Sequence, residues 1–207
     1  MTMLAVASPA LKVLFERVGR PEVLDRPDAL GRGGGGAVIA CNHVGWADSL
    51  WLAYAVYPRP LRFLSKRELF ASPIASWALG QGGSIPIDRG IPSPSSIKTA
   101  VDAVRNGEII LIFPTGTRNA ASTDFKRGAA TIALTAGAPL VPAFYRGPKS
   151  MQMAHLMARP RIQISFAPAI ATAGLPPGRE SACALTLRLH AEIVRLQACA
   201  TPQPQAA

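Results

Sequence analysis

Residues 37–48 read AVIACNHVGWAD and join an apolar run to a polar loop. The run at 37–41 predicts a buried strand, and the loop after a strand is a common place for catalytic side chains. In this loop the imidazole of His43 can take a proton from a hydroxyl, and a carboxylate on its other nitrogen fixes the tautomer. We expect Asp48 to be that carboxylate, because Gly45 permits the tight turn that returns it to His43.

Taken alone, His43 and Asp48 also fit a loop whose polar side chains bond to their own backbone. Two further polar segments favour catalysis, because each of them follows a predicted strand. Arg89 stands at the end of one strand, and a turn at 114–118 follows the apolar residues 108–113. The carboxyl ends of parallel strands meet at one edge of a sheet, so these side chains are expected to converge.

Predicted strands and helices alternate along the chain at the spacing of βα units. The predicted fold is therefore α/β, a single domain with a mostly parallel central sheet flanked by helices, plus an amphipathic N-terminal helix. The remaining strands are expected at 61–65, 82–89, 140–145 and 161–166, and the helices at 49–57, 93–106, 129–136 and 181–198.

Composition divides the chain into three parts. Residues 1–36 hold an amphipathic helix at 3–18 and a glycine-rich flexible connector at 19–36, residues 37–200 form the main domain, and residues 201–207 form a disordered tail. The helix is expected either to pack on the domain or to anchor it shallowly in a membrane. Packing is favoured, because only two cations lie on its polar face.

The composition of the 207 residues limits the possible partners. They are 49% hydrophobic with a net charge of +10, but no uninterrupted apolar stretch reaches the roughly 18 residues of a membrane span. No basic residue precedes the apolar N-terminus, so a signal peptide is not expected. The basic residues are scattered and aromatic residues are only 6% of the chain, which disfavours nucleic acid. An anionic membrane surface or an anionic ligand is favoured instead.

The cysteines and the other two histidines carry no catalytic pattern. Cys41, Cys183 and Cys199 form no metal-binding spacing and predict buried thiols in a reducing cytoplasm. His155 lies among three methionines, which indicates packing or a flexible lip at a membrane. His190 lies among leucines of the C-terminal helix and is interpreted as structural.

Four sequence blocks follow one another in a fixed order: Asn42-His43 with Asp48, then Gly83-x-Ile-x-x-Asp-Arg89, then Phe-Pro-Thr-Gly-Thr-Arg at 113–118, and Val-Pro-Ala at 141–143. This order and spacing resemble the glycerophospholipid acyltransferase family, the 1-acylglycerol-3-phosphate acyltransferases. The resemblance covers residues 37–146, and Lys66 falls where the family often has a lysine. Four blocks in order, in a basic and apolar chain, indicate membership of this family.

The resemblance implies a mechanism in which His43 is the general base and Asp48 orients it. The base would deprotonate the hydroxyl of a lysolipid, which attacks the thioester of acyl-CoA or of an acyl carrier protein. Neither a metal nor a bound cofactor is implied. Arg89 and Arg118 would hold the phosphate of the acceptor, because a guanidinium pairs with two phosphate oxygens. The rest of the implied substrate-binding set is Asn42, Lys66, Thr115, Gly116 and Thr117, with backbone N–H groups near Gly116 as candidate oxyanion donors.

One residue departs from the family pattern. Thr115 stands where the family has Glu, and Asn119 stands where the family has Ser. Threonine can still close a local turn, but it cannot carry a negative charge or orient an arginine. We therefore expect an altered acceptor site at Thr115.

The leading prediction is an acyltransferase at the cytoplasmic face of the cell membrane, bound peripherally, that converts 1-acylglycerol-3-phosphate to phosphatidate. Within the same class, the acceptor could be another lysolipid, such as a lyso-ornithine lipid. From other classes, the chain could be a non-catalytic lipid-binding module, or a metal hydrolase using His43 and Asp48. Three histidines without a second ligand cluster make the hydrolase the weakest of these.

Overall fold

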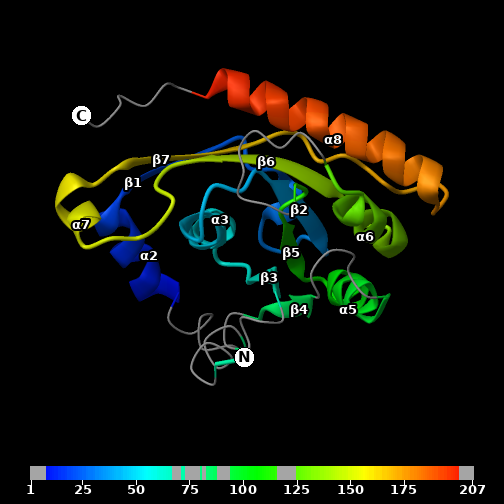
Figure 1. The fold of residues 1–207 in the computed structure, drawn as a ribbon, viewed down its shortest axis with the longest axis horizontal. Helices are drawn as coiled ribbons and strands as arrows, with labels where there is room; N and C mark the ends of the chain where they lie inside the picture. Colours follow the sequence, from blue (N-terminus) through cyan, green and yellow to red (C-terminus); the bar gives the residue numbers. More distant parts are fainter. Residues whose placement is uncertain are drawn as a thin grey trace.

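The computed structural model describes residues 8–66, 71–72, 80, 83–87, 94–115 and 125–200. In these ranges a seven-stranded sheet has helices on both of its faces (Figure 1). The strands are β1 (Arg20–Leu24), β2 (Ala37–Cys41), β3 (Leu61–Lys66), β4 (Ile85–Ile87), β5 (Ile109–Ile112), β6 (Leu140–Arg146) and β7 (Arg161–Phe166). The predicted α/β class and mostly parallel sheet are therefore confirmed.

The strand order is β1-β7-β6-β2-β5-β3-β4. Every neighbouring pair is parallel except β6 and β7, which run antiparallel. Strand β2 lies at the centre, and all five of its residues are buried. A strand covered on both faces needs a continuous apolar run, which is why AVIAC identifies it from sequence.

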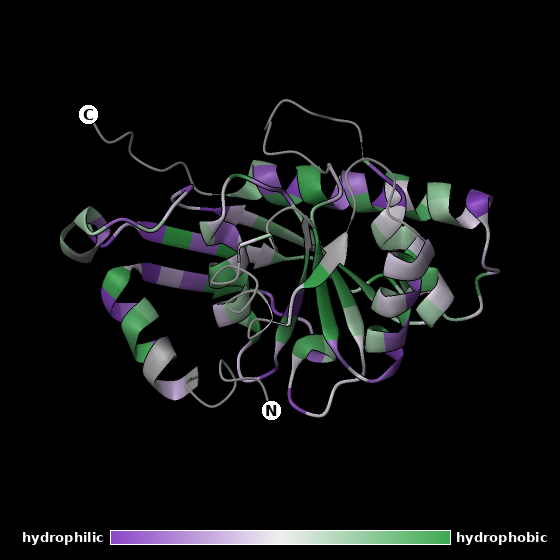
Figure 2. Ribbon diagram, turned by 60° about the horizontal axis from the view of Figure 1, so that its bottom comes forward, coloured by the Kyte–Doolittle hydropathy of each residue, from purple (hydrophilic) through white to green (hydrophobic). Residues whose placement is uncertain are grey.

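Helices cover the two faces of the sheet unequally. On one face lie α5 (Pro94–Arg105), α6 (Gly128–Ala136) and α8 (Arg179–Cys199), and on the other lie α2 (Ser8–Val18) and α3 (Ala47–Val56). The short elements are η1 (Asp28–Leu30) and α7 (Ala154–Ala158). Figure 2 shows α8 with hydrophobic and hydrophilic residues alternating along it, and its buried residues include Leu185, Leu189, Ile193 and Leu196. No helix in the described ranges is long and apolar enough to cross a bilayer.

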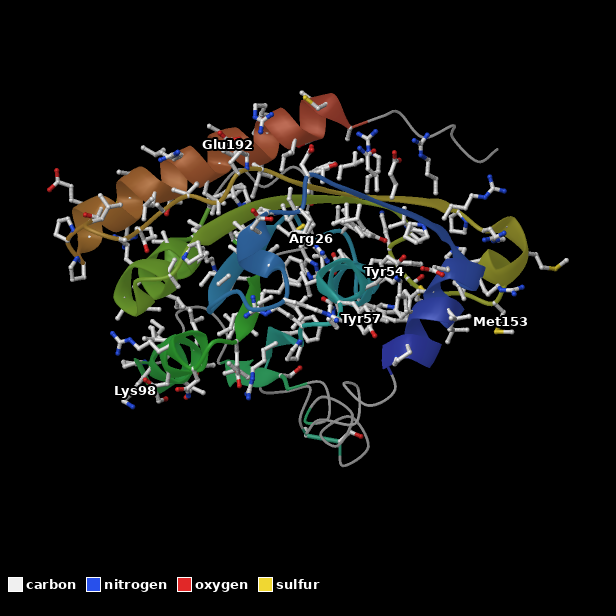
Figure 3. All side chains as sticks on the ribbon, turned by 180° about the vertical axis from the view of Figure 1, so that it is seen from behind. Arg26, Tyr54, Tyr57, Lys98, Met153 and Glu192 are labelled. Atoms are coloured by element: carbon white, nitrogen blue, oxygen red, sulfur yellow. The ribbon has the colours of Figure 1, made fainter. Side chains whose placement is uncertain are left out.

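Helix α2 packs on the domain through an aromatic contact. The ring of Phe15 meets the ring of Trp51 edge-on, with centroids 4.7 Å apart. Tyr54, which lies between α3 and α2 in Figure 3, donates a 3.0 Å hydrogen bond to Glu16. Burial and the Glu16 carboxylate raise the pKa of Tyr54 to about 12. Helix α2 therefore packs on the domain over residues 8–18, and residues 3–7 of the predicted helix lie outside the described residues.

The prediction of a flexible connector over 19–36 is wrong for residues 20–24 and 28–30, which form regular structure. Residues 20–24 form β1, which pairs in parallel with β7 in the register Arg20↔Arg161. Pro21 is tolerated because β1 is an edge strand. The strand could not be found from sequence, because its partner lies about 140 residues away and its own residues include only two large apolar ones, Val23 and Leu24.

The cysteine prediction is confirmed only for Cys41. Its side chain is buried, whereas Cys183 and Cys199 are exposed on α8. Burial and the nearby Asp48 raise the pKa of the Cys41 thiol well above its ordinary value. The predicted disordered tail at 201–207 lies outside the described residues.

Candidate active site

The site is built at one edge of the sheet. Strands β2, β5 and β6 are parallel neighbours, so their carboxyl ends lie together. The loop with His43 follows β2, the turn with Thr115 follows β5, and residues 147–149 follow β6. The predicted convergence of strand ends is thus present for the described residues.

The predicted His43 and Asp48 pair is in contact. The Nδ1 atom of His43 lies 2.8 Å from the Oδ2 atom of Asp48. The Asp48 side chain is completely buried, and that of His43 is 15% exposed. A carboxylate can only accept hydrogen bonds, so we assign the ring proton to Nδ1. This tautomer makes Nε2 the nitrogen that can accept a proton.

Asp48 is held by more than the histidine. Its Oδ2 atom also accepts hydrogen bonds from the backbone N–H groups of Val44 at 2.9 Å and Gly45 at 3.1 Å. Its Oδ1 atom lies 3.3 Å from the hydroxyl of Ser49, which can donate to it. Four donors satisfy a buried carboxylate that would otherwise be costly to bury. Contrary to the predicted loop, Asp48 belongs to the first turn of α3, where the helix dipole favours a negative charge.

The imidazole is also fixed by an aromatic neighbour. The rings of His43 and Phe113 stack with centroids 3.9 Å apart and an interplanar angle of 17°. Phe113 directly follows β5, so a residue of the third sequence block stacks on the histidine of the first. In the sequence, Phe113 stood out only as part of that block. Its contact with the His43 ring could not be inferred without the pairing of β2 with β5.

Asn42 is tied to the backbone of β6. Its amide NH2 donates to the carbonyl of Tyr145 at 2.9 Å, and its amide oxygen accepts from the N–H of Tyr145 at 2.7 Å. These two bonds continue the pairing of β2 with β6 by one side chain. The geometry therefore indicates that Asn42 positions the loop in front of His43.

Residues 145–149 pack against the loop that carries His43 and were not identified from the sequence. The buried hydroxyl of Tyr145 donates to the carbonyl of Pro148 at 2.9 Å, and burial with the nearby Asp48 raises its pKa. The carbonyl of Lys149 accepts a 3.3 Å bond from the N–H of Ala47. A Cβ atom at Gly45 would overlap this carbonyl. Gly45 is thus needed for close approach rather than for an unusual φ angle.

The other predicted site residues are only partly visible. Thr115 is half-buried in the turn after β5, and Lys66 is the last residue of β3. The remaining four, Arg89, Gly116, Thr117 and Arg118, lie outside the described residues. His190 packs against the ring of Phe125, as expected of a structural histidine. Within the described ranges, no three His, Cys, Asp or Glu residues gather as a metal site would require.

The arrangement can remove a proton from a hydroxyl. A base with an assigned tautomer, a buried carboxylate behind it and a stacked ring beside it has little freedom to reorient. The His43 side chain lies at the carboxyl ends of the strands and keeps 15% of its surface exposed. Such an arrangement suits nucleophilic attack by an alcohol on an activated acyl group.

Comparison with known proteins adds independent findings. The family model described as Acyltransferase matches residues 17–146. The 1-acyl-sn-glycerol-3-phosphate acyltransferase of Bacillus subtilis is 36% identical over 195 residues, which are 91% of this chain and 94% of that protein. The lyso-ornithine lipid O-acyltransferase of Pseudomonas aeruginosa is 38% identical over 77 residues, which are 37% of this chain and 29% of that protein.

A solved structure shares the fold. The 1-acyl-sn-glycerophosphate (LPA) acyltransferase PlsC from Thermotoga maritima superposes with a TM-score of 0.67. The match covers 94% of this chain and 81% of that one, at 16% sequence identity. The seven-stranded arrangement with helices on both faces is therefore a known architecture.

Proposed function

Because this chain belongs to the Acyltransferase family, we propose that it transfers a fatty acyl group from an acyl thioester to the hydroxyl of 1-acylglycerol-3-phosphate, giving phosphatidate. The enzyme class, an O-acyltransferase, follows from the family. The acceptor is proposed from the Bacillus subtilis relative, whose name gives that substrate and which aligns with 91% of this chain. The donor is acyl-CoA or an acyl carrier protein.

The contact between His43 and Asp48 carries the proposal. The Nε2 atom of His43 takes the proton of the acceptor hydroxyl as its oxygen attacks the thioester carbon. The new C–O bond forms, the C–S bond breaks, and the imidazolium returns the proton to the departing thiolate. Asp48 stabilises the imidazolium in between, and base catalysis of this kind contributes about 10²–10⁴-fold in rate.

The basic residues supply the proposed recognition of the acceptor phosphate. Arg89 and Arg118 remain the proposed phosphate ligands, and Lys66, the last residue of β3, remains a proposed substrate-binding residue. The net charge of +10 supports an anionic substrate and a location at the cytoplasmic face of the membrane, where anionic lipids concentrate.

The deciding experiment measures transfer of labelled acyl groups from both donors to a panel of lysolipids in detergent micelles. We expect product from 1-acylglycerol-3-phosphate with the wild type and none above background with His43→Ala. His190→Ala is the matched control, because that histidine packs on Phe125. A chelator should leave the rate unchanged. Equal rates for wild type and His43→Ala would refute the general base, and transfer from neither donor would favour a non-catalytic lipid-binding module.

A second acceptor is favoured by one specific observation. Thr115 replaces the glutamate of the family block, and part of this chain resembles a protein named as a lyso-ornithine lipid O-acyltransferase. A lyso-ornithine lipid therefore belongs in the panel. If Thr115 sets the acceptor, Thr115→Glu should shift the ratio of the two products toward phosphatidate. An unchanged ratio would assign the preference to other residues.

A further inference from the structure

Two helices stand at the same edge of the sheet as His43. Helix α2 leads into β1 at Arg20, and α7 leads into β7 at Arg161, and these two residues are register partners. Because β7 is antiparallel to β6, both helices lie at the edge where β6 ends. Figure 1 shows α2 and α7 side by side there, and the guanidinium of Arg159 donates a 2.8 Å bond to the backbone carbonyl of Glu16 in α2.

These helices expose large apolar side chains. Met153, just before α7, is 79% exposed, and Met157, within α7, is 92% exposed. Val13 and Leu14 of α2 are 55% and 52% exposed. On α2, these two residues lie on either side of Arg17, and Leu14 is one helical turn before the buried Val18. Figure 3 shows Met153 beside α2. We call this set the α2/α7 surface: Val13, Leu14, Met153 and Met157.

The surroundings of the α2/α7 surface are basic. Residues 8–20 and 149–159 contain five basic residues, Lys12, Arg17, Arg20, Lys149 and Arg159, and one acidic residue, Glu16. The acidic residue already has partners, because Glu16 pairs with Lys12 and accepts from Tyr54. By contrast, α8 exposes Leu187 and Val194 among three basic and two acidic residues. Apolar exposure and positive charge therefore coincide at the α2/α7 surface.

We propose that the α2/α7 surface docks the enzyme on an anionic membrane, with Met153 and Met157 inserted among the lipid headgroups. Methionine suits this place because its unbranched side chain adapts to an irregular, moving partner. The basic residues add electrostatic attraction to anionic lipid. The docking rests on the proposed function, since a lysolipid acceptor resides in such a membrane.

The surface is joined to the catalytic loop by the chain itself. Residue 149 precedes α7 by only a few residues, and its carbonyl accepts a hydrogen bond from the N–H of Ala47, the first residue of α3 and the neighbour of Asp48. Trp46, 48% exposed in that loop, adds an aromatic side chain of the kind that settles at a lipid interface. Docking through α7 would therefore bring the edge that carries His43 toward the lipid.

The test is sedimentation of full-length protein with vesicles of phosphatidylglycerol and phosphatidylcholine, compared with phosphatidylcholine alone. We expect the wild type to bind the anionic vesicles and the double variant Met153→Ser/Met157→Ser to bind at least about tenfold more weakly. Leu187→Ser/Val194→Ser removes two exposed apolar residues of α8 and should bind as the wild type does. Arg17→Gln/Lys149→Gln should weaken binding to anionic vesicles only, and the loss should shrink in high salt.

Activity assays separate this proposal from the proposed function. The Met153/Met157 double variant should keep wild-type activity on a monodisperse short-chain lysolipid and lose activity on lysolipid embedded in anionic vesicles. The His43→Ala protein should bind vesicles like the wild type. The docking is overturned if the wild type does not bind anionic vesicles, or if the Met153/Met157 and Leu187/Val194 double variants bind them equally. It is also overturned if the methionine variant changes only the oligomeric mass. Failure of acyl transfer in detergent would instead overturn the proposed function.

Discussion

Two polar clusters lie at opposite ends of the central strands, one at the carboxyl edge of the sheet and one at the amino edge, and their hydrogen bonds have different partners. At the carboxyl edge, Asp48 accepts from three backbone or side-chain N–H groups, one of them on the ring of His43. At the amino edge, Arg59 donates to the carbonyls of Ala29 at 2.9 Å and of Gly35 and Gly107 at 2.7 Å. Burial lowers the pKa of Arg59 from its ordinary value.

The difference separates a structural cluster from the cluster that we propose to be catalytic. Arg59 directs its donors at backbone carbonyls, so it joins the segments that lead into β2 and β5 and completes no site. Asp48 directs its acceptors at a loop and a reactive ring, so its bonds hold a base in place. The comparison implies that the amino edge governs stability and that the carboxyl edge governs turnover. The variants below test this division, from the largest expected effect to the smallest.

His43→Ala should lower kcat by about 10²–10⁴-fold, because it removes the base, and should change the melting temperature little. The measurement is acyl transfer together with thermal unfolding of the same preparations. A melting temperature lowered as strongly as that of an Arg59 variant would contradict the division between the two edges.

Asp48→Asn should affect both properties. The neutral amide no longer stabilises the imidazolium, so kcat should fall by at least about tenfold to a hundredfold. Charge-assisted bonds from Val44 and Gly45 become neutral ones, which should cost about 1–3 kcal/mol in the free energy of unfolding. Denaturant titration measures the free energy of unfolding, and acyl-transfer kinetics measure kcat. A kcat of Asp48→Asn equal to that of the wild type would show that Asp48 has no part in the mechanism.

Arg59→Gln should destabilise without slowing the chemistry. The variant leaves carbonyls at Ala29, Gly35 and Gly107 with weaker partners, and we expect a loss of about 2–3 kcal/mol in the free energy of unfolding. The value of kcat per folded molecule should stay within about twofold of the wild type. A tenfold fall in kcat would show that the two edges are coupled.

Two glycine substitutions make a matched pair. A Cβ at Gly45 would overlap the carbonyl of Lys149, and a Cβ at Gly36 would overlap the carbonyl of Val104. Each alanine variant should lose about 1–3 kcal/mol of stability from overpacking. Only Gly45→Ala should also lower kcat, because only that shift reaches His43. Equal kcat values for the two variants would contradict this assignment.

Tyr54→Phe lies at neither edge and should have the smallest effect, about 0.5–1 kcal/mol from the lost bond to Glu16. Folding raises the pKa of Tyr54 from 10.0 to about 12, so its stabilising contribution is complete below pH 10 and is lost as the pH rises toward 12. Denaturation at pH 8 and pH 11 checks the sign. The stability advantage of the wild type over Tyr54→Phe should be smaller at pH 11 than at pH 8.

Several features could be read from the sequence because they depend on neighbours along the chain. The apolar run of β2, the spacing of His43 and Asp48, and the end of α6 at Gly137 are all local patterns. Gly137 has a φ angle of 67°, which glycine adopts without strain at a helix end. These local choices agreed with the fold, so the strand β2 lies where it was expected and His43 meets Asp48.

Other features were decided by contacts between distant segments. The pairing of β1 with β7, the amide of Asn42 on Tyr145 and the ring of Phe113 on His43 each join residues that are far apart in sequence. Such contacts produce no local sequence pattern, because neither partner residue is unusual among its neighbours along the chain. The sequence by itself thus determined the fold class and the chemical pair. Only the tertiary structure decided what holds that pair rigid, because positioning depends on packing in three dimensions.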